Sequence, residues 1–291
     1  MNEINYTVDL IIIGTNQIRS DYTDKLTKFM LRGVAKNLPW INQIFLILPS
    51  LESVPTGLNL SEFKILFYED IVPQDILDKV SKHNIELFVP NIVELSENYL
   101  IMRDTTFILE PLQADQFFDF TNNKLKIFTT PCLTKENFPR NIKINKSFLY
   151  NNSNMNLPAI LEHPNFGLVS GKKSLWLQFI NENFMNIQKN FDEYSQEILF
   201  YYLKKNKAII STRDISEGLF EHHSLWAGII KYDLINNSER KIVTLSTDFT
   251  YYENKNYQLH PTAEEWIIEG LKFRLGTTPC KYELDWQQTK K

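Results

Sequence analysis

The sequence has few cysteines, no strong excess of either charge and no long apolar run. Cys132 and Cys280 are far apart and lack the spacing of a structural metal site, so they indicate free thiols in a reducing compartment. The formal net charge of −4 over 291 residues argues against a nucleic-acid-binding surface, so no nucleic-acid partner is expected.

Signals for export and for membrane insertion are also missing from the sequence. Glu3 and Asp9 stand where a secretory signal would carry basic residues. No stretch approaches the roughly 20 apolar residues of a membrane-spanning helix. We therefore expect a cytoplasmic protein without a transmembrane segment, and a peripheral contact with the inner face of the membrane stays open.

What the sequence does contain is ample material for a core, with 43% hydrophobic and 13% aromatic residues. Short apolar runs alternate with amphipathic segments over the first 135 residues, which favours a mostly parallel, twisted sheet flanked by helices. The expected helix covers residues 21–37, and a further short helix is expected over 73–83. The expected strands cover residues 8–14, 43–49, 63–70 and 98–104.

Residues 136–291 have a more helical pattern. Amphipathic segments at 172–188, 195–208 and 261–276 predict helices, and the run at 241–252 predicts a strand that returns to the core. Residues 137–157 are rich in Asn, Lys and Pro, which indicates a loop or lid. We expect an α/β core over 1–135 and a mixed portion over 136–291, joined in one integrated domain.

The common phosphate-binding, zinc-protease and serine-hydrolase motifs do not occur, so candidate site residues must come from strand ends. Ligands of open α/β sheets bind outside the carboxyl ends of the strands. The residues at these expected ends are Gly14-Thr15-Asn16, Pro49-Ser50, Glu69-Asp70 and Arg103-Asp104.

Asp104 follows an apolar run in the stretch "NYLIMRDTTFILEP" at 98–111. A carboxylate at such an end can hold Mg²⁺ or Mn²⁺ on a nucleotide diphosphate, or accept a proton from an attacking hydroxyl. A strand that simply ends in a polar, turn-capping Asp explains the pattern equally well.

The block from residue 31 to 118 resembles the Stealth family. It reads "LRGVAKNLPW", "YEDIVP", "SKHNIE" and "LIMRDTTFILEP" where the family has L-R-S-I-x-x-x-x-P-W, H-x-D-I-x-P, N-S-x-A-I-E and F-N-D-D-x-F-L-x-x-P. Members of this family are sugar-1-phosphate transferases of bacterial capsule synthesis, and the GlcNAc-phosphotransferase of animals is related to them. The resemblance therefore implies a GT-A-like nucleotide-sugar fold, with the donor bound by residues 1–135 and the acceptor by residues 136–291.

The resemblance also assigns site residues. Asp104 falls on the first aspartate of N-D-D, Glu86 on the I-E glutamate and Arg32 on the L-R-S arginine, while His163 and Asp248 resemble later H-x-P and N-D elements. The implied catalytic residues are Asp104, Asp248, His163 and Glu86, the implied substrate-binding residues are Arg103, Arg32, Asn16 and Asp9, and the implied metal ligand is Asp104. Simpler explanations stay open: Glu86 on a solvated helix, His163 on a surface loop and Arg32 in an ion pair.

Several family positions differ in this chain. Arg103-Asp104-Thr105 replaces N-D-D, so the second carboxylate is missing, and residues 15–19 keep none of the carboxylates of the family's first segment. Three hypotheses follow from this pattern. The chain is a sugar-1-phosphate transferase acting on a nucleotide sugar and a polysaccharide acceptor with Mg²⁺ or Mn²⁺, a glycosyltransferase that transfers the sugar itself, or an inactive binding protein on the same fold.

Overall fold

The computed structural model describes most of the chain. The described residues are 6–14, 21–80, 84–103, 106–132, 161–164, 167–189, 196–213, 220–224, 241–246 and 261–285.

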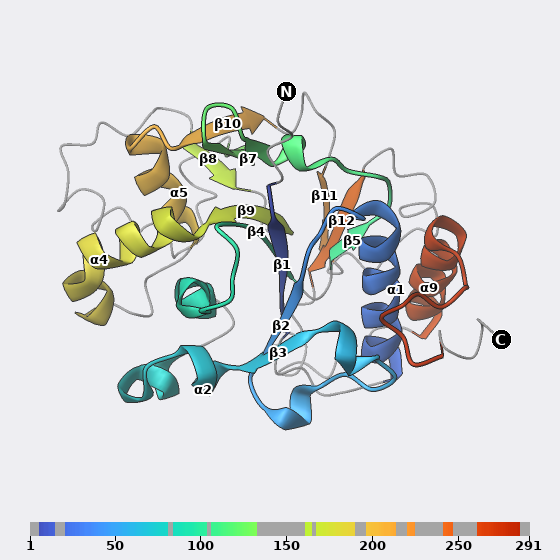
Figure 1. Cartoon of the computed structure of the whole chain (residues 1–291). Helices are drawn as coiled ribbons and strands as arrows, with labels where there is room; N and C mark the ends of the chain where they lie inside the picture. Colours follow the sequence, from blue (N-terminus) through green and yellow to red (C-terminus); the bar gives the residue numbers. More distant parts are fainter. Residues whose placement is uncertain are drawn as a thin grey trace.

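A central sheet of five strands organises the molecule (Figure 1). Its strand order is β3-β2-β1-β4-β9, and the strands are parallel except for β9, which runs antiparallel to β4. The bounds are β1 Val8–Ile13, β2 Ile44–Leu48, β3 Lys64–Phe67, β4 Asn98–Arg103 and β9 Leu168–Lys172. Every residue of β1 and β2 is buried, as expected for parallel strands covered on both faces.

The strand order reverses between β1 and β4. The chain first moves outward from β1 to β2 and β3, and it then crosses back to place β4 on the other side of β1. Such a reversal leaves a crevice outside the carboxyl ends of the two strands that flank it, and ligands of open α/β sheets bind there. The topology alone therefore predicts a ligand site at the carboxyl ends of β1 and β4.

Helices cover both faces of this sheet. Helix α1 (Asp21–Asn37) packs beside α9 (Pro261–Leu275) on one side, and α4 (Lys173–Lys189) lies on the other side with the 3₁₀ helix η4 (Ile85–Asn91) (Figure 1). Gly33 lets α1 approach closely, because a Cβ there would lie 2.7 Å from the carbonyl oxygen of Ile108. Asn37 donates a 2.7 Å hydrogen bond to the same oxygen, which fixes α1 against strand β5.

Two smaller sheets complete the described part. One has the order β10-β7-β6, with β8 paired to β7, and the other has the order β11-β12-β5. Their strands are β5 Thr106–Ile108, β6 Phe118–Asp119, β7 Lys124–Cys132, β8 Leu161–Pro164, β10 Ile209–Arg213, β11 Phe220–Ser224 and β12 Ile242–Ser246. The remaining helices are η1 Leu51–Ser53, η2 Leu60–Glu62, α2 Tyr68–Ile71, η3 Gln74–Lys79, η5 Ala114–Gln116 and α5 Gln196–Lys205.

The predicted fold class is confirmed, and most expected elements occur where the sequence placed them. The third strand is shorter than expected because the carboxylate of Asp70 accepts a 2.6 Å hydrogen bond from the Phe67 amide and begins helix α2. The helix expected at 73–83 is instead the 3₁₀ helix η3. The loop expected at 137–157 lies outside the described residues.

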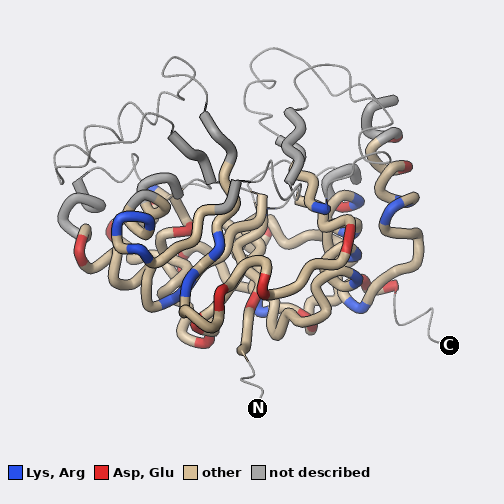
Figure 2. Tube along the Cα trace, turned by 90° about the horizontal axis from the view of Figure 1, so that it is seen from above, with Lys and Arg blue, Asp and Glu red and all other residues tan. Residues whose placement is uncertain are grey.

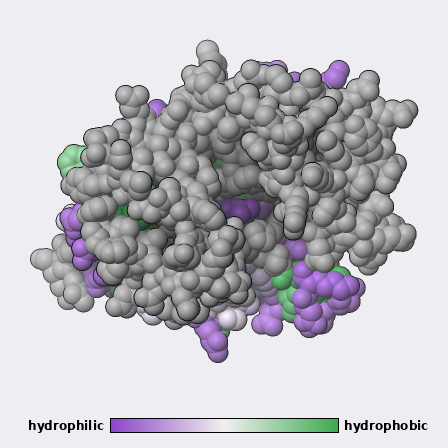
Figure 3. Space-filling view, turned by 180° about the vertical axis from the view of Figure 1, so that it is seen from behind, coloured by the Kyte–Doolittle hydropathy of each residue, from purple (hydrophilic) through white to green (hydrophobic). Residues whose placement is uncertain are grey.

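The described surface is mixed in charge and hydropathy. Lysine, arginine, aspartate and glutamate are interspersed along the described trace (Figure 2). Seen from behind, hydrophobic and hydrophilic residues lie side by side at the lower edge, and hydrophilic residues lie at the floor of a central hollow (Figure 3). Among the described helices, none is both long enough and apolar enough to cross a bilayer.

Candidate active site

The carboxyl ends of β1 and β4 meet at the point where the strand order reverses. Ile13 lies opposite Arg103 in the parallel ladder, and Gly14 continues beyond β1 with its amide bonded to Ile47 O at 2.9 Å. Asn16, the predicted substrate-binding residue, comes two residues later and lies outside the described part. Arg103 is therefore the predicted site residue that the structure places directly at this edge.

Arg103 forms an ion pair with Glu86. The Nη2 atom of Arg103 lies 3.4 Å from Oε1 of Glu86, which reaches it from η4. The Glu86 side chain is 3% exposed, whereas that of Arg103 is 30% exposed. The alternative that Glu86 lies on a solvated helix face is thus wrong: its carboxylate is buried beneath an arginine whose other side reaches solvent.

Tyr99 lies on β4 four residues before Arg103, on the same face of the sheet. It packs opposite Gly171, where a Cβ would lie 2.2 Å from its ring, and its ring centroid is 6.3 Å from that of Trp176. Burial raises the pKa of Tyr99 well above its usual range, and the negative charges of Glu86 and then Glu97 raise it further. Tyr99 therefore stays neutral, and the charged pair stands above an aromatic layer.

Gly167 joins the two strands on either side of Asp104. Its carbonyl oxygen accepts a hydrogen bond from the Arg103 amide at 3.3 Å and one from Thr106 Oγ1 at 3.0 Å. Asp104 stands between Arg103 and Thr106 in the sequence and itself lies outside the described residues. Both flanks of the leading candidate are therefore fixed to one backbone carbonyl.

Thr244 and Gly167 are each four residues from a further candidate, which is Asp248 for Thr244 and His163 for Gly167. Thr244 on β12 lies opposite Thr106 on β5, with their Oγ1 atoms 3.2 Å apart, and Asp248 follows Thr244 by four residues. His163 precedes Gly167 by four residues, and its backbone in β8 pairs with Thr130 in β7. Asp248 and the side chain of His163 lie outside the described part, so the structure brings together chain segments next to these residues.

Asp9 is at the opposite end of the sheet. It lies near the beginning of β1 and is 1% exposed. Its Oδ1 accepts a 2.9 Å hydrogen bond from Asn42 Nδ2, and its Oδ2 accepts a 2.7 Å bond from the Ser96 amide. This position does not support the predicted substrate-binding role, because both oxygens hold together the loops that lead into β2 and β4.

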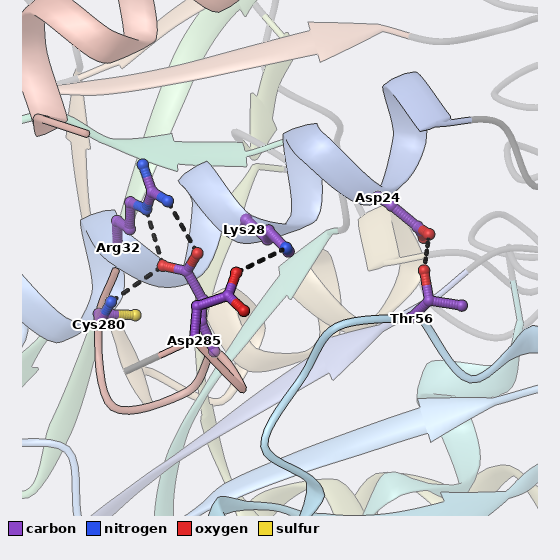
Figure 4. Close-up of polar contacts among 7 residues, drawn as sticks. Asp24, Lys28, Arg32, Thr56, Cys280 and Asp285 are labelled. Atoms are coloured by element: carbon purple, nitrogen blue, oxygen red, sulfur yellow. Dashed lines mark hydrogen bonds and ion pairs between the residues drawn. The ribbon is translucent and has the colours of Figure 1, made fainter. Parts of the chain in front are cut away.

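Arg32 is committed to the C-terminal segment (Figure 4). Its Nε and Nη2 atoms lie 2.7 and 2.8 Å from the two carboxylate oxygens of Glu283, and its Nη1 donates to Gly276 O at 3.1 Å. The Cys280 amide donates to Glu283 as well, at 2.9 Å. The structure thus supports the ion-pair alternative for Arg32, on a helix face away from the ends of β1 and β4.

The environment of Glu283 has a clear electrostatic signature. Burial by itself raises the pKa of this carboxyl, but the hydrogen bonds from Arg32 and from the Cys280 amide outweigh that effect, so the pKa lies below its ordinary value. Glu283 is 1% exposed and charged. It is therefore a structural anion that holds α1 to the segment following α9.

Metal ligands were predicted at Asp104. Within the described ranges, no group of three or more His, Cys, Asp or Glu side chains is placed to hold an ion. Asp104, whose carboxylate has the hard oxygen atoms that Mg²⁺ and Mn²⁺ prefer, lies outside the described residues, so its role as a metal ligand stays a prediction.

Sequence reasoning missed Gly167, Thr106 and Thr244. The threonines have no motif of their own, and their alternation with apolar neighbours is typical of any strand. Gly167 could not be recognised from the sequence, because its role is to let its backbone approach Thr244 closely: a Cβ at this position would lie 2.0 Å from Thr244 Oγ1.

Comparison with known proteins identifies the central block. Residues 19–127 match the model of Stealth protein CR2, conserved region 2. Residues 19–127 are therefore similar to this conserved region, and they are called the Stealth region below. The region contains α1, β2, β3, η4, β4 and β5, and therefore Arg32, Glu86, Arg103 and Asp104.

Curated relatives align over the same part of the chain. The capsular polysaccharide phosphotransferase cps12A of Actinobacillus pleuropneumoniae is 29% identical over 129 residues, which are 43% of this chain and 34% of the relative. The capsular polysaccharide phosphotransferase WcwK of Streptococcus pneumoniae is 27% identical over 126 residues, which are 43% of this chain and 37% of the relative. The aligned part spans about a third of the length of these relatives.

The whole chain resembles a solved glycosyltransferase in fold. The galactosyltransferase LgtC, solved with donor and acceptor sugar analogues, superimposes with a TM-score of 0.54 at 12% identity, covering 96% of this chain and 99% of that chain. An active-site mutant of LgtC gives a TM-score of 0.51 at 13% identity, with the same coverage of both chains. The Stealth region is thus part of a GT-A-like fold, as the resemblance implied.

Proposed function

We propose that this chain transfers a sugar-1-phosphate from a nucleotide sugar to a hydroxyl of a glycan acceptor in surface polysaccharide synthesis. The observation that supports the proposal is the position of Arg103 in the Stealth region: it ends β4 at the point where the strand order reverses, and Asp104 is the next residue in the sequence. The relatives that share this region are named capsular polysaccharide phosphotransferases.

The proposed reaction is a displacement at phosphorus. The acceptor oxygen forms a bond to the phosphorus that carries the sugar, the bond from that phosphorus to the bridging oxygen breaks, and the nucleoside monophosphate leaves with the electron pair. Asp104 takes the proton from the acceptor hydroxyl, or holds the divalent cation on the diphosphate, with Asp248 as second carboxylate and His163 beside them. Mg²⁺ or Mn²⁺, when bound, supplies positive charge to the phosphoryl oxygens.

In this proposal Arg103 binds the substrate and Glu86 positions that arginine. Glu86 is buried and contacts Arg103, so it acts on the substrate through that arginine. The carboxylate compensates much of the arginine charge, which leaves Arg103 as a directed hydrogen-bond donor to a phosphate oxygen. A cation at Asp104 is then needed to offset the charge of the diphosphate.

The two halves of the chain divide the substrates in this proposal. Residues 1–135 bind the nucleotide sugar and residues 136–291 the polysaccharide acceptor. The reaction takes place in the cytoplasm, at the inner face of the membrane.

The similarity to the LgtC fold supports a second candidate function, in which the chain transfers the sugar itself, as a galactosyltransferase does. The replacement of the second carboxylate by Thr105 motivates a third, an inactive binding protein.

Product analysis separates the three functions. The chain is incubated with UDP-sugars, Mg²⁺ or Mn²⁺ and a capsular oligosaccharide. Release of UMP is the expected result. Release of UDP would show sugar transfer, and binding of donor without release of either nucleotide would show a binding protein.

A further inference from the structure

Strands β5 and β12 are joined to each other, and to the end of β4, by a series of hydrogen bonds. Thr106 Oγ1 donates its one proton to Gly167 O at 3.0 Å. Thr244 must therefore be the donor in the 3.2 Å contact between the two threonine hydroxyls. The series runs from Thr244 to Thr106 to Gly167 O, which also accepts from the Arg103 amide.

These groups are sealed from solvent and closely fitted. Thr106 is fully buried and Thr244 is 7% exposed. A Cβ at Gly167 would lie 2.0 Å from Thr244 Oγ1 and 3.3 Å from Thr106 Oγ1. A glycine is thus required for the carbonyl of residue 167 to reach both strands.

The residues joined in this way come from distant parts of the chain. Thr106 and Thr244 are 138 positions apart, and Thr106 and Gly167 are 61 positions apart. Thr106 belongs to the Stealth region, whereas Gly167 and Thr244 lie beyond it. The antiparallel pairing of β5 with β12 places Thr106 opposite Thr244, so the contact between the two hydroxyls forms in this one register.

We propose that Thr106, Thr244 and Gly167 form a latch that positions Arg103, at the end of β4, for transfer. The Arg103 amide bonds to Gly167 O, the carbonyl to which Thr106 also donates, so a shift of this carbonyl moves the end of β4 and with it Arg103. The inference rests on the proposed function, since it assigns positioning residues to the transfer reaction. None of the three residues touches the substrate.

The test uses an isosteric variant and its rescue. Thr244→Val removes the hydroxyl and keeps the shape, and it leaves no donor without an acceptor because Thr106 still donates to Gly167. We expect kcat to fall roughly 10- to 100-fold, the loss that a small misplacement of reacting groups causes. The KM for the acceptor should change less than about twofold, and Thr244→Ser should restore kcat.

Ser170→Ala is the matched control. Ser170 is 3% exposed and its hydroxyl donates to Lys126 O at 2.9 Å on β9, so this variant also removes one buried hydroxyl bond. We expect it to lower the unfolding temperature as much as Thr244→Val does and to leave kcat unchanged. A merely structural hydroxyl at Thr244 would give the same pattern as Ser170.

Full kcat in Thr244→Val would overturn the latch, as would equal losses of kcat in Thr244→Val and Ser170→Ala. Thr106→Val provides a second measurement if Thr244→Val fails to fold, with Thr106→Ser as its rescue and the same criteria. Failure of the proposed function looks different, because the wild-type chain would then release no UMP.

Discussion

Two arginine–glutamate pairs hold different regions of this molecule, and their geometries differ. Arg32 and Glu283 meet through two short contacts of 2.7 and 2.8 Å, with further bonds to Gly276 O and from the Cys280 amide. Arg103 and Glu86 meet through a longer contact of 3.4 Å. The arginine side chains are 12% and 30% exposed, and both glutamates are nearly fully buried.

The Arg32–Glu283 pair, called the clamp below, is bidentate, whereas the Arg103–Glu86 pair has a longer contact. A bidentate pair with extra hydrogen bonds fixes both side chains and stabilises the fold. The Arg103 side chain is 30% exposed, so part of it faces solvent, where a ligand can reach it. The Arg103 pair lies at the end of β4, next to the candidate site, whereas the Arg32 pair lies between α1 and the C-terminal segment.

The largest expected effect is on catalysis at the candidate site. Asp104→Asn should reduce the transfer rate by about 10³-fold, because the amide neither accepts the proton nor binds a cation as a carboxylate does. Nucleotide release is the measurement, and circular dichroism checks that the variant stays folded. A fully active Asp104→Asn would show that the chemistry lies elsewhere.

The next effect is on stability at the clamp. Glu283→Gln leaves the half-buried Arg32 without its anion, so we expect a loss of about 3 kcal/mol in the free energy of unfolding. Urea denaturation measures it. The folded fraction should keep its kcat, and a change in kcat without a loss of stability would reverse the assignment of the two pairs.

The same substitution at Glu86 should instead affect kcat more than stability. Glu86→Gln is expected to lower kcat about tenfold, because Arg103 loses its orientation. It should cost only about 1 kcal/mol of stability, since the Arg103 side chain can turn to water. Kinetics and denaturation of the two glutamine variants, measured side by side, test the comparison directly.

A smaller effect appears as the pH is lowered. The pKa of Glu283 is below its ordinary value of 4.5, so its contribution to stability is fully present above pH 4.5. That contribution falls as the pH drops through the lower pKa of the folded state. The stability difference between wild type and Glu283→Gln should therefore shrink in acid, and an unchanged difference at about pH 3 would contradict the assignment.

The last effect concerns the reactivity of Cys280 beside the clamp. Burial raises the pKa of its thiol to about 11, so little thiolate exists near neutral pH. A Cys132→Ser variant, which keeps Cys280, should react with a thiol reagent roughly 100-fold more slowly than a free cysteine. Adding Glu283→Gln should speed the reaction by opening the clamp, and equal rates in the two variants would argue that the clamp does not cover Cys280.

The central strands and helix α1 could be predicted from the sequence because the spacing of apolar residues indicates which positions are buried. The runs at β1, β2 and β4, and the spacing of α1, predicted elements that the structure confirms. The partner of Arg32 was not predicted, since nothing in a local pattern selects Glu283 over other acidic residues. Likewise, the short helix at Asp70 depended on one side-chain bond to the backbone.

The candidate site was predicted only up to the strand ends. Arg103 could be placed because it ends a buried strand. The meeting of Gly167, Thr106 and Thr244 could not, because three segments far apart in sequence converge through polar contacts that have no periodicity. The prediction for Asp9 followed its family position alone. It did not consider that Asp9 lies near the beginning of β1, at the opposite end of the sheet from the candidate site.

The clamp also sets an order on folding in the cell. Arg32 and Glu283 are 251 residues apart, so helix α1 leaves the ribosome long before its anion is made. At translation rates of about 5–20 residues per second, the interval is on the order of 10 to 50 seconds. During that time the nascent Stealth region has an unneutralised guanidinium on α1 and an uncovered face where α9 later packs. Helix α1 can therefore complete its packing only after residues 261–285 have been made.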